Sequence, residues 1–254
     1  MTEIIRDIND MAEWCRRRRS AVGALGFVPT MGALHAGHRS LLEQARAENG
    51  TAAASIFVNP TQYDDPADLD NYPRTFEADL RILESLGVDA LFFPSSEAIY
   101  PMNYRFRLTE SPESEQLEGA HRKGHFDGVL SIVLKLLLIT RPTRAYFGEK
   151  DWQQYSLVRD MARAFFLETE IVGCPTVREE DGLALSSRNV HLSSEERRIA
   201  PEFHRILCSK ADMDEQRRQL EAAGFEVDYV ERRWDRILGA VRLGQTRLID
   251  NVST

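Results

Sequence analysis

Two histidines three residues apart are the part of this sequence best suited to chemistry. His35 and His38 lie in the stretch PTMGALHAGH (residues 29–38), between an apolar run and a predicted amphipathic helix. On a helix, residues at this spacing share a face, so both imidazoles could point at one anion. A helix N-terminus adds unpaired backbone N–H groups and partial positive charge, which favours phosphate. The plainer alternative is that one histidine caps the helix and the other is exposed.

Three further polar loops have residues suited to binding a ligand, and the first two of them follow apolar runs. In FVNPTQY (residues 57–63), the amide of Gln62 can donate and accept at once, which suits a small acid bearing hydroxyls. In FGEKDWQQ (residues 147–154), Lys150 offers a point charge for phosphate. In DGLALSSRN (residues 181–189), two hydroxyls and the guanidinium of Arg188 could hold a triphosphate. Taken singly, these are also consistent with a strand-ending turn, a solvated charge run and a capping loop.

Other classes of chemistry lack their signatures. The sequence has no Gly-x-Gly-x-x-Gly motif, no Walker loop, and no Cys, His, Asp or Glu cluster at metal-ligand spacing. No serine or cysteine has an identifiable base partner. The stretch GAHRKGHFDGV (residues 119–129) suggests a flap or wall over an anion, with His125 as a hydrogen-bonded structural residue. We therefore expect catalysis by positioning and electrostatic stabilisation, without a covalent enzyme intermediate.

The elements that must position these loops alternate over the first two-thirds of the chain. The apolar patterns predict strands at 21–28, 52–58, 88–93, 144–147 and 170–173, and helices at 39–48, 75–86, 128–139 and 152–165. This order predicts an α/β fold, a Rossmann-like, mostly parallel sheet with helices on both faces. Ligands of such sheets bind beyond the C-terminal strand ends, where three of the motif loops begin.

The last third of the chain has a different pattern. We predict helices at 193–210 and 214–223, the first opened by a Ser-Ser-Glu-Glu cap, and strands at 225–230, 236–242 and 246–249. A hairpin turn is expected at 243–245. The predicted domains are residues 1–176, which would bind ligands, and a smaller α+β lid domain at 177–254.

Composition narrows the class of protein. The chain has 254 residues, 43% of them hydrophobic and 28% charged, with a formal net charge of −8 that counts against a nucleic-acid partner. The longest apolar run, 129–139, contains Lys135 and is too short for a bilayer span, so a core helix and no membrane partner are expected. The N-terminal residues show no signal-peptide pattern. Three cysteines without CxxC spacing indicate neither disulfides nor zinc, and the cytoplasm is the expected compartment.

With these motifs assembled, the chain resembles the pantoate–β-alanine ligase family, within the superfamily of HxGH nucleotidyltransferases and class I aminoacyl-tRNA synthetases. The matching blocks are VPTMGALHAGH, SIFVNPTQYDDPADLDNYPRT, LEGAHRKGHFDGV, YFGEKDWQQ, DGLALSSRN and RLIDN, in family order from Val28 to Asn251. HxGH alone marks only the superfamily, whereas the later blocks in order are specific to the family.

The resemblance implies that pantoate and Mg-ATP form pantoyl adenylate and pyrophosphate, and that β-alanine then displaces AMP to give pantothenate. It implies no tightly bound organic cofactor, no protein metal site and a homodimer. The implied catalytic residues are His38, the proton donor, with His35 and Lys150. The residues implied to bind ATP are Met31, Gly32, Ala33, Leu34, His35, Ala36, Gly37, His38, Gly148, Glu149, Lys150, Asp151, Val177, Leu185, Ser186, Ser187 and Arg188. Those implied to bind the other substrates are Gln62, Gln154, Asn59 and Tyr72.

The sequence departs from the family pattern in places. Thr61 stands where the family usually has Met, Lys123 and Asp127 change the pattern around His125, and the C-terminal domain looks shorter than usual. The second-ranked interpretation is an adenylate-forming ligase or nucleotidyltransferase for another small carboxylic acid. A third is an ATP-sensing or RNA-binding module, because a fold does not fix a function. The net charge counts against RNA, and the intact motifs count against a pure sensor.

Overall fold

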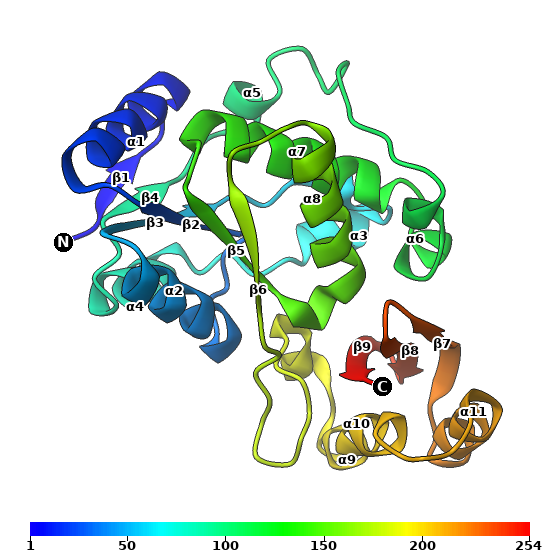
Figure 1. The fold of residues 1–254 in the computed structure, drawn as a ribbon. Coiled ribbons are helices and arrows are strands. Elements are labelled where there is room, and N and C mark those ends of the chain that lie inside the picture. Colours follow the sequence, from blue (N-terminus) through cyan, green and yellow to red (C-terminus); the bar gives the residue numbers. More distant parts are fainter. The chain divides into compact units, whose positions relative to one another are not determined.

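The computed structural model describes residues 1–254 and divides into two compact units (Figure 1). The first unit comprises Met1–Leu34, His38–Gly148 and Gln153–Cys174. The second comprises Pro175–Thr254 and two short segments, His35–Gly37 and Glu149–Trp152. Sequence interpretation assigned both short segments to the first domain. The domain boundary between residues 176 and 177 stays a prediction.

The first unit is built on a six-stranded parallel sheet in the order β1-β4-β3-β2-β5-β6. Its strands are β1 (Glu3–Ile5), β2 (Leu25–Thr30), β3 (Thr51–Ile56), β4 (Ala90–Phe92), β5 (Arg144–Gly148) and β6 (Glu170–Cys174). The predicted parallel sheet is confirmed. Because parallel strands end at the same edge, the loops after β2 and β3 leave the sheet together; Thr30 pairs with Ile56.

Helices cover both faces of this sheet (Figure 1). They are α1 (Ile8–Val22), α2 (Ala36–Glu48), α3 (Pro66–Asp70), α4 (Phe76–Ser85), α5 (Ser96–Ile99), α6 (Glu118–His121), α7 (His125–Thr140) and α8 (Trp152–Ala164), with 3-10 turns η1 (Pro60–Gln62), η2 (Glu113–Glu115) and η3 (Glu149–Asp151). One core joins α1, α7 and α8 to one face, and another joins α2 and α4 to the opposite face. Adjacent strand residues divide between them: Phe27 lies in the first core and Val28 in the second.

The second unit contains a three-stranded antiparallel sheet in the order β7-β8-β9. Its elements are η4 (Ser187–His191), α9 (Ser194–Ile199), α10 (Pro201–Leu207), α11 (Met213–Ala222), β7 (Glu226–Arg233), β8 (Arg236–Leu243) and β9 (Thr246–Ser253). Two-residue turns join the strands: Trp234 and Asp235 have φ of 51° and 56°, and Gly244 has φ of 58°. Their core includes Phe203, Leu220 and Val241. The predicted smaller α+β part is confirmed.

Several predicted elements differ from the observed ones. The predicted helix at 193–210 is two helices, because Pro201 has no N–H to donate and begins α10. The predicted strand at 21–28 begins only at Leu25, since α1 runs through Val22 and ends at Gly23 with φ of 93°. The sequence interpretation proposed neither α1 nor β1. No helix combines the length and the apolar character that a bilayer span needs.

Candidate functional site

The turn between β2 and α2 is held by a buried carboxylate. Asp79, on α4 and 2% exposed, accepts hydrogen bonds from the backbone N–H groups of Ala33 at 3.0 Å and Leu34 at 2.8 Å. Thr75 also donates its hydroxyl to this carboxylate. Ala33 has φ of 50°, a conformation that alanine rarely adopts. The Asp79 carboxylate therefore stabilises a turn whose backbone conformation at Ala33 is unfavourable for alanine.

The backbone N–H groups around this turn bear on the expectation of unpaired donors at the start of the helix. Besides the two N–H groups bound to Asp79, that of Gly32 donates to the Thr30 hydroxyl and that of Gly37 donates to Nδ1 of His35. Of these four residues, only Gly37 lies in the first turn of α2, so the expectation of unpaired N–H groups at this helix N-terminus is wrong for Gly37. Any contact of Ala33 or Leu34 with a nucleotide uses other atoms.

The two histidines differ in position. The helix α2 begins at Ala36, so His35 precedes it and His38 lies in its first turn. The expectation that both share one helical face is therefore wrong. His38 is half-buried and belongs to the first unit, whereas His35 clusters with the second.

His35 is held as a neutral imidazole. Burial lowers its pKa, the charge of Lys150 lowers it further, and Asp151 opposes both with a smaller effect. Because Nδ1 accepts the Gly37 N–H at 3.1 Å, the ring proton resides on Nε2. His35 can therefore present a neutral N–H donor to an anion.

The loop after β3 forms a network around Asn59, which is 1% exposed. Its amide donates to Oε1 of Gln62 at 3.0 Å and to the carbonyl of Gly128 at 3.2 Å. Its Oδ1 accepts from Tyr100 at 2.8 Å and from Thr61 at 3.0 Å. Asn59 is thus a structural anchor for Gln62, and Thr61 contacts both Asn59 and Tyr100 in the same network.

His125 fixes the same loop from α7. Its Nδ1 lies 2.8 Å from the carbonyl of Gln62, and its Nε2 lies 3.1 Å from Nη1 of Arg122. Since arginine can only donate, Nε2 accepts and Nδ1 carries the proton. This matches the sequence interpretation of His125 as a hydrogen-bonded structural residue.

The other residues predicted to bind the small acid are Gln62, Tyr72 and Gln154. Nε2 of Gln62 lies 3.2 Å from the sulfur of Met31, and Tyr63 packs edge-on against Tyr72 at 6.2 Å between ring centroids. On α8, the buried Gln153 is structural, since its amide bonds the backbone of residues 113, 116 and 118. The half-buried Gln154 stands outside that network.

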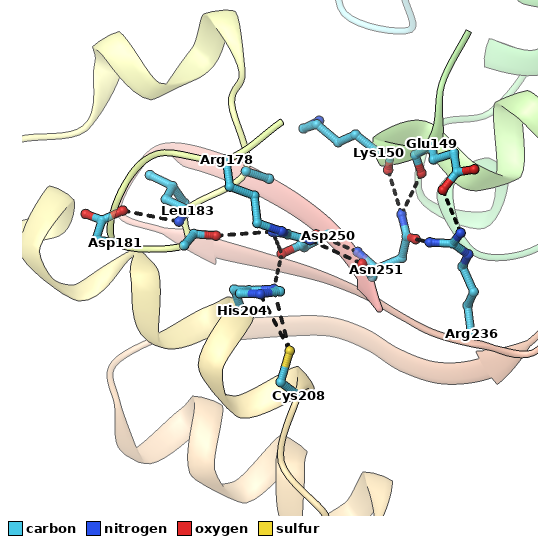
Figure 2. Close-up of polar contacts among 12 residues, drawn as sticks. Glu149, Lys150, Arg178, Asp181, Leu183, His204, Cys208, Arg236, Asp250 and Asn251 are labelled. Atoms are coloured by element: carbon cyan, nitrogen blue, oxygen red, sulfur yellow. Dashed lines mark hydrogen bonds and ion pairs between the residues drawn. The ribbon is translucent and has the colours of Figure 1, made fainter. Parts of the chain in front are cut away.

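The second unit fixes the segment that carries Lys150 (Figure 2). The Lys150 ammonium lies 3.8 Å from a carboxylate oxygen of Asp151, and its side chain is 19% exposed. The Glu149 carboxylate is engaged by Arg236 at 2.7 Å. Asn251 donates its amide to the carbonyls of Glu149 and Lys150. Gly148, just before this segment, is the last residue of β5.

A second polar cluster braces the loop before Arg188 (Figure 2). Arg178 binds both carboxylate oxygens of Asp250, at 2.7 and 2.8 Å, and His204 lies 3.1 Å from the same group. Burial would raise the pKa of Asp250, but the hydrogen bonds from His204 and Arg178 outweigh it and the pKa is lowered. Arg178 pairs with Ala184 across this loop.

The loop then leads directly into the predicted nucleotide-binding residues. The N–H of Leu185 donates to the carbonyl of Val177 at 3.0 Å. The hydroxyl of Ser186 accepts from the N–H of Arg188 at 3.2 Å, and Ser187 begins η4. The structure shows no group of three or more His, Cys, Asp or Glu that could hold a metal ion.

Comparison with known proteins identifies the family. The family model described as Pantoate-beta-alanine ligase matches residues 3–253. The chain belongs to the pantoate–β-alanine ligase family. It is 51% identical to a pantothenate synthetase of Bdellovibrio bacteriovorus over 99% of both chains. It is 47% identical to one of Coxiella burnetii, over 99% of this chain and 97% of the relative.

Solved structures of this ligase family have the same fold. A pantoate-beta-alanine ligase from Francisella tularensis, complexed with beta-gamma ATP and beta-alanine, has a TM-score of 0.93 and 41% identity, covering 100% of this chain and 98% of that one. A pantothenate synthetase from Thermus thermophilus has a TM-score of 0.88 and 41% identity, covering 99% of both. Membership in the ligase family confirms the predicted family, fold class and ligase function.

Sequence reasoning missed some of the residues that hold this ligase site together. Asp79 lies four residues before Leu83, and both are buried on α4. A carboxylate at a core position of an amphipathic helix was the available signal. Arg236 gave no such signal, because its partners lie in a distant segment. Asn251 was noticed only as part of the RLIDN block.

Proposed function

We propose that the chain catalyses the ATP-dependent ligation of pantoate and β-alanine, giving pantothenate, AMP and pyrophosphate. The observation that carries the proposal is the family match, which runs from residue 3 to residue 253. It is supported by the Francisella ligase, whose structure was determined with beta-gamma ATP and beta-alanine.

The proposed chemistry has two steps. A carboxylate oxygen of pantoate attacks the α-phosphorus of Mg-ATP, the bond to the bridging oxygen breaks, and pyrophosphate leaves with the electron pair. The β-alanine amine then attacks the carbonyl carbon of pantoyl adenylate. The bond from that carbon to the AMP oxygen breaks, and the nitrogen loses its proton as the amide forms.

The proposed nucleotide residues neutralise the charge that develops on phosphate. Lys150 supplies a point charge, Arg188 a planar fork, and His35 a neutral donor whose lowered pKa keeps it uncharged near pH 7. His38 is proposed as the proton donor. The other proposed ATP residues are Met31, Gly32, Ala33, Leu34, Ala36, Gly37, Gly148, Glu149, Asp151, Val177, Leu185, Ser186 and Ser187.

The proposed acid-binding residues favour a small hydroxy acid. Gln62 would bind the hydroxyls or the carboxylate with the amide atoms that its contacts to Asn59 and Met31 orient. Gln154 and Tyr72 are proposed to join it. A site built to pair hydroxyls rejects an acid that lacks them, because its own polar groups would stay unpaired. We also propose Mg²⁺ as part of the ATP substrate, a homodimer and a cytoplasmic location.

Pantoate-dependent exchange of labelled pyrophosphate into ATP tests the first step, and β-alanine-dependent AMP release tests the second. We expect both with pantoate, and far weaker exchange with its analogue lacking the hydroxyls. Strong exchange with another small acid and none with pantoate would favour the adenylate-forming alternative. ATP binding without exchange would instead indicate a sensor.

A substitution separates the nucleotide assignment from the fold. Lys150→Ala should lower pantoate-dependent exchange by about 100-fold or more, because it removes a charge proposed to act on the phosphates. Urea unfolding should remain cooperative. Near-normal pyrophosphate release by this variant would contradict the role of Lys150.

A further inference from the structure

Asn251 reaches back across the sequence to the segment that carries Lys150. Its side-chain amide, on β9, donates to the carbonyl of Glu149 at 2.8 Å and to that of Lys150 at 3.0 Å (Figure 2). The residue is 2% exposed. One amide that bonds two successive carbonyls fixes both the position and the orientation of that backbone.

Arg236, on the neighbouring strand β8, completes the arrangement. Its Nη1 donates to Oδ1 of Asn251 at 2.7 Å, and its Nη2 donates to the Glu149 carboxylate at 2.7 Å. Its guanidinium carbon lies 3.6 Å from the ring centroid of Trp152. Arg236 therefore orients the Asn251 side chain, and it also contacts the same segment through Glu149 and Trp152.

The segment that carries Lys150 is short and lies between β5 and α8. Its helical part, η3, is three residues long and gives only a single turn. The Lys150 ammonium sits on a flexible four-carbon stem, so its reach is set by where its backbone is fixed. Asn251 and Arg236 bond this backbone and the Glu149 side chain from a distant part of the chain.

We propose that Asn251 and Arg236 are positioning residues for the ligase reaction: they hold the backbone of Glu149 and Lys150 so that the Lys150 ammonium is presented to the triphosphate in one place. This rests on the proposed function of Lys150 in binding ATP. Neither residue is among those proposed to bind a substrate.

The first test measures exchange activity after Asn251 or Arg236 is replaced, with another arginine of the same sheet as the control. Asn251→Ala and Arg236→Ala should each lower kcat/KM of pantoate-dependent pyrophosphate exchange by about 10- to 100-fold, the scale expected when a reacting group is displaced by about 1 Å. Arg247→Ala is the matched control. Arg247 and Arg236 are 16% and 15% exposed in their side chains, and each pairs with a carboxylate, but the partner of Arg247 is Asp228 on β7. The control should keep near-normal exchange.

The second test asks whether Asn251 acts through Lys150. Calorimetric binding of Mg-ATP is measured for the wild type, Asn251→Ala, Lys150→Ala and the double variant. Asn251→Ala should weaken binding about tenfold in the wild-type background and less than twofold once Lys150 is already Ala, because the group being positioned is gone. Equal weakening in both backgrounds would overturn the proposal.

Controls keep the outcomes apart. If the wild type itself shows no pantoate-dependent exchange, the proposed function fails. If the wild type is active and the cycle is additive, only the positioning role fails. If Asn251→Ala does not unfold cooperatively in urea, the same cycle is carried out with Arg236→Lys. Lysine keeps the charge but lacks the planar fork whose two nitrogens bond Asn251 and Glu149 separately. Normal exchange and ATP binding by Arg236→Lys would likewise count against the proposal.

Discussion

At the scale of single residues, the polar groups of this chain act mainly on backbone. Asp79 binds two N–H groups of the turn after β2, and Asn251 binds two carbonyls of the segment around Lys150. Each satisfies groups that would otherwise lose hydrogen bonds on burial. The residues proposed to bind substrate therefore depend on others that are not assigned to substrate binding.

Replacing Asp79 with Asn should loosen the turn that precedes α2. The amide would offer one acceptor oxygen where the carboxylate offers two, leaving a buried N–H unpaired at a cost of about 1–3 kcal/mol. We expect a lower free energy of unfolding in urea and weaker exchange activity. Glu77→Gln, which removes an exposed carboxylate from the first turn of the same helix, is the control. Equal stability of the two variants would argue against the role of Asp79.

His35 should make the protein sensitive to acid. Its pKa is lowered in the folded state, so the unfolded chain binds a proton first and the free energy of unfolding falls as pH drops below about 6.5. The contribution is absent at higher pH, where both states are neutral. His35→Asn keeps an acceptor for the N–H of Gly37 but cannot titrate. It should reduce the slope of the free energy of unfolding against pH by at most the uptake of one proton. Urea unfolding at pH 7.5 and 5.5, with His191→Asn at an exposed position as control, checks this. An unchanged slope in His35→Asn would refute it.

At the scale of elements, close approach of α7 to η1 sets the place of Gln62. A Cβ added at Gly128 would lie 2.3 Å from the carbonyl oxygen of Thr61 and 2.6 Å from Cα of Gln62. Both are backbone atoms, which cannot move aside as a side chain would. The helix can pack here only because this position has no side chain.

Gly128→Ala should therefore displace the loop that carries Gln62. We expect overpacking to lower the free energy of unfolding by about 1–3 kcal/mol. The KM for pantoate should rise several-fold while the KM for ATP changes little, because the loop is proposed to bind the acid. Steady-state kinetics with each substrate varied in turn measure the split. Leu138→Ala, at an exposed position of α7, is the control. A pantoate KM equal to that of the wild type would contradict the assignment of the loop.

At the scale of the whole molecule, the alternation of apolar runs predicted a parallel sheet, five of its six strands and the helices α2, α4, α7 and α8, but neither β1 nor α1. It could not predict the strand order. The strand β1 is only three residues long, and it pairs with β4, which lies far away in sequence. The pattern also could not show that Ala21 and Val22 belong to a helix, because one apolar run is divided between the end of α1 and the start of β2. Motif residues were found by type and spacing. Of the groups that hold them, Asp79 could have been found as a carboxylate on the core face of α4. Arg236 could not, because its partner Glu149 lies 87 residues away in sequence.

The hydrogen bond between Asn251 and Glu149 also has a consequence for the order of events during synthesis. The amide of Asn251 and the carbonyl of Glu149 are separated by 102 residues, and a ribosome adds residues from the N-terminus onward. At about 5–20 residues per second, β9 emerges at least several seconds after the segment it must hold. A nascent chain can thus complete its parallel sheet while its lysine loop is still unanchored. We therefore expect pantoate-dependent exchange to reach its full rate only after the final strand has been synthesised.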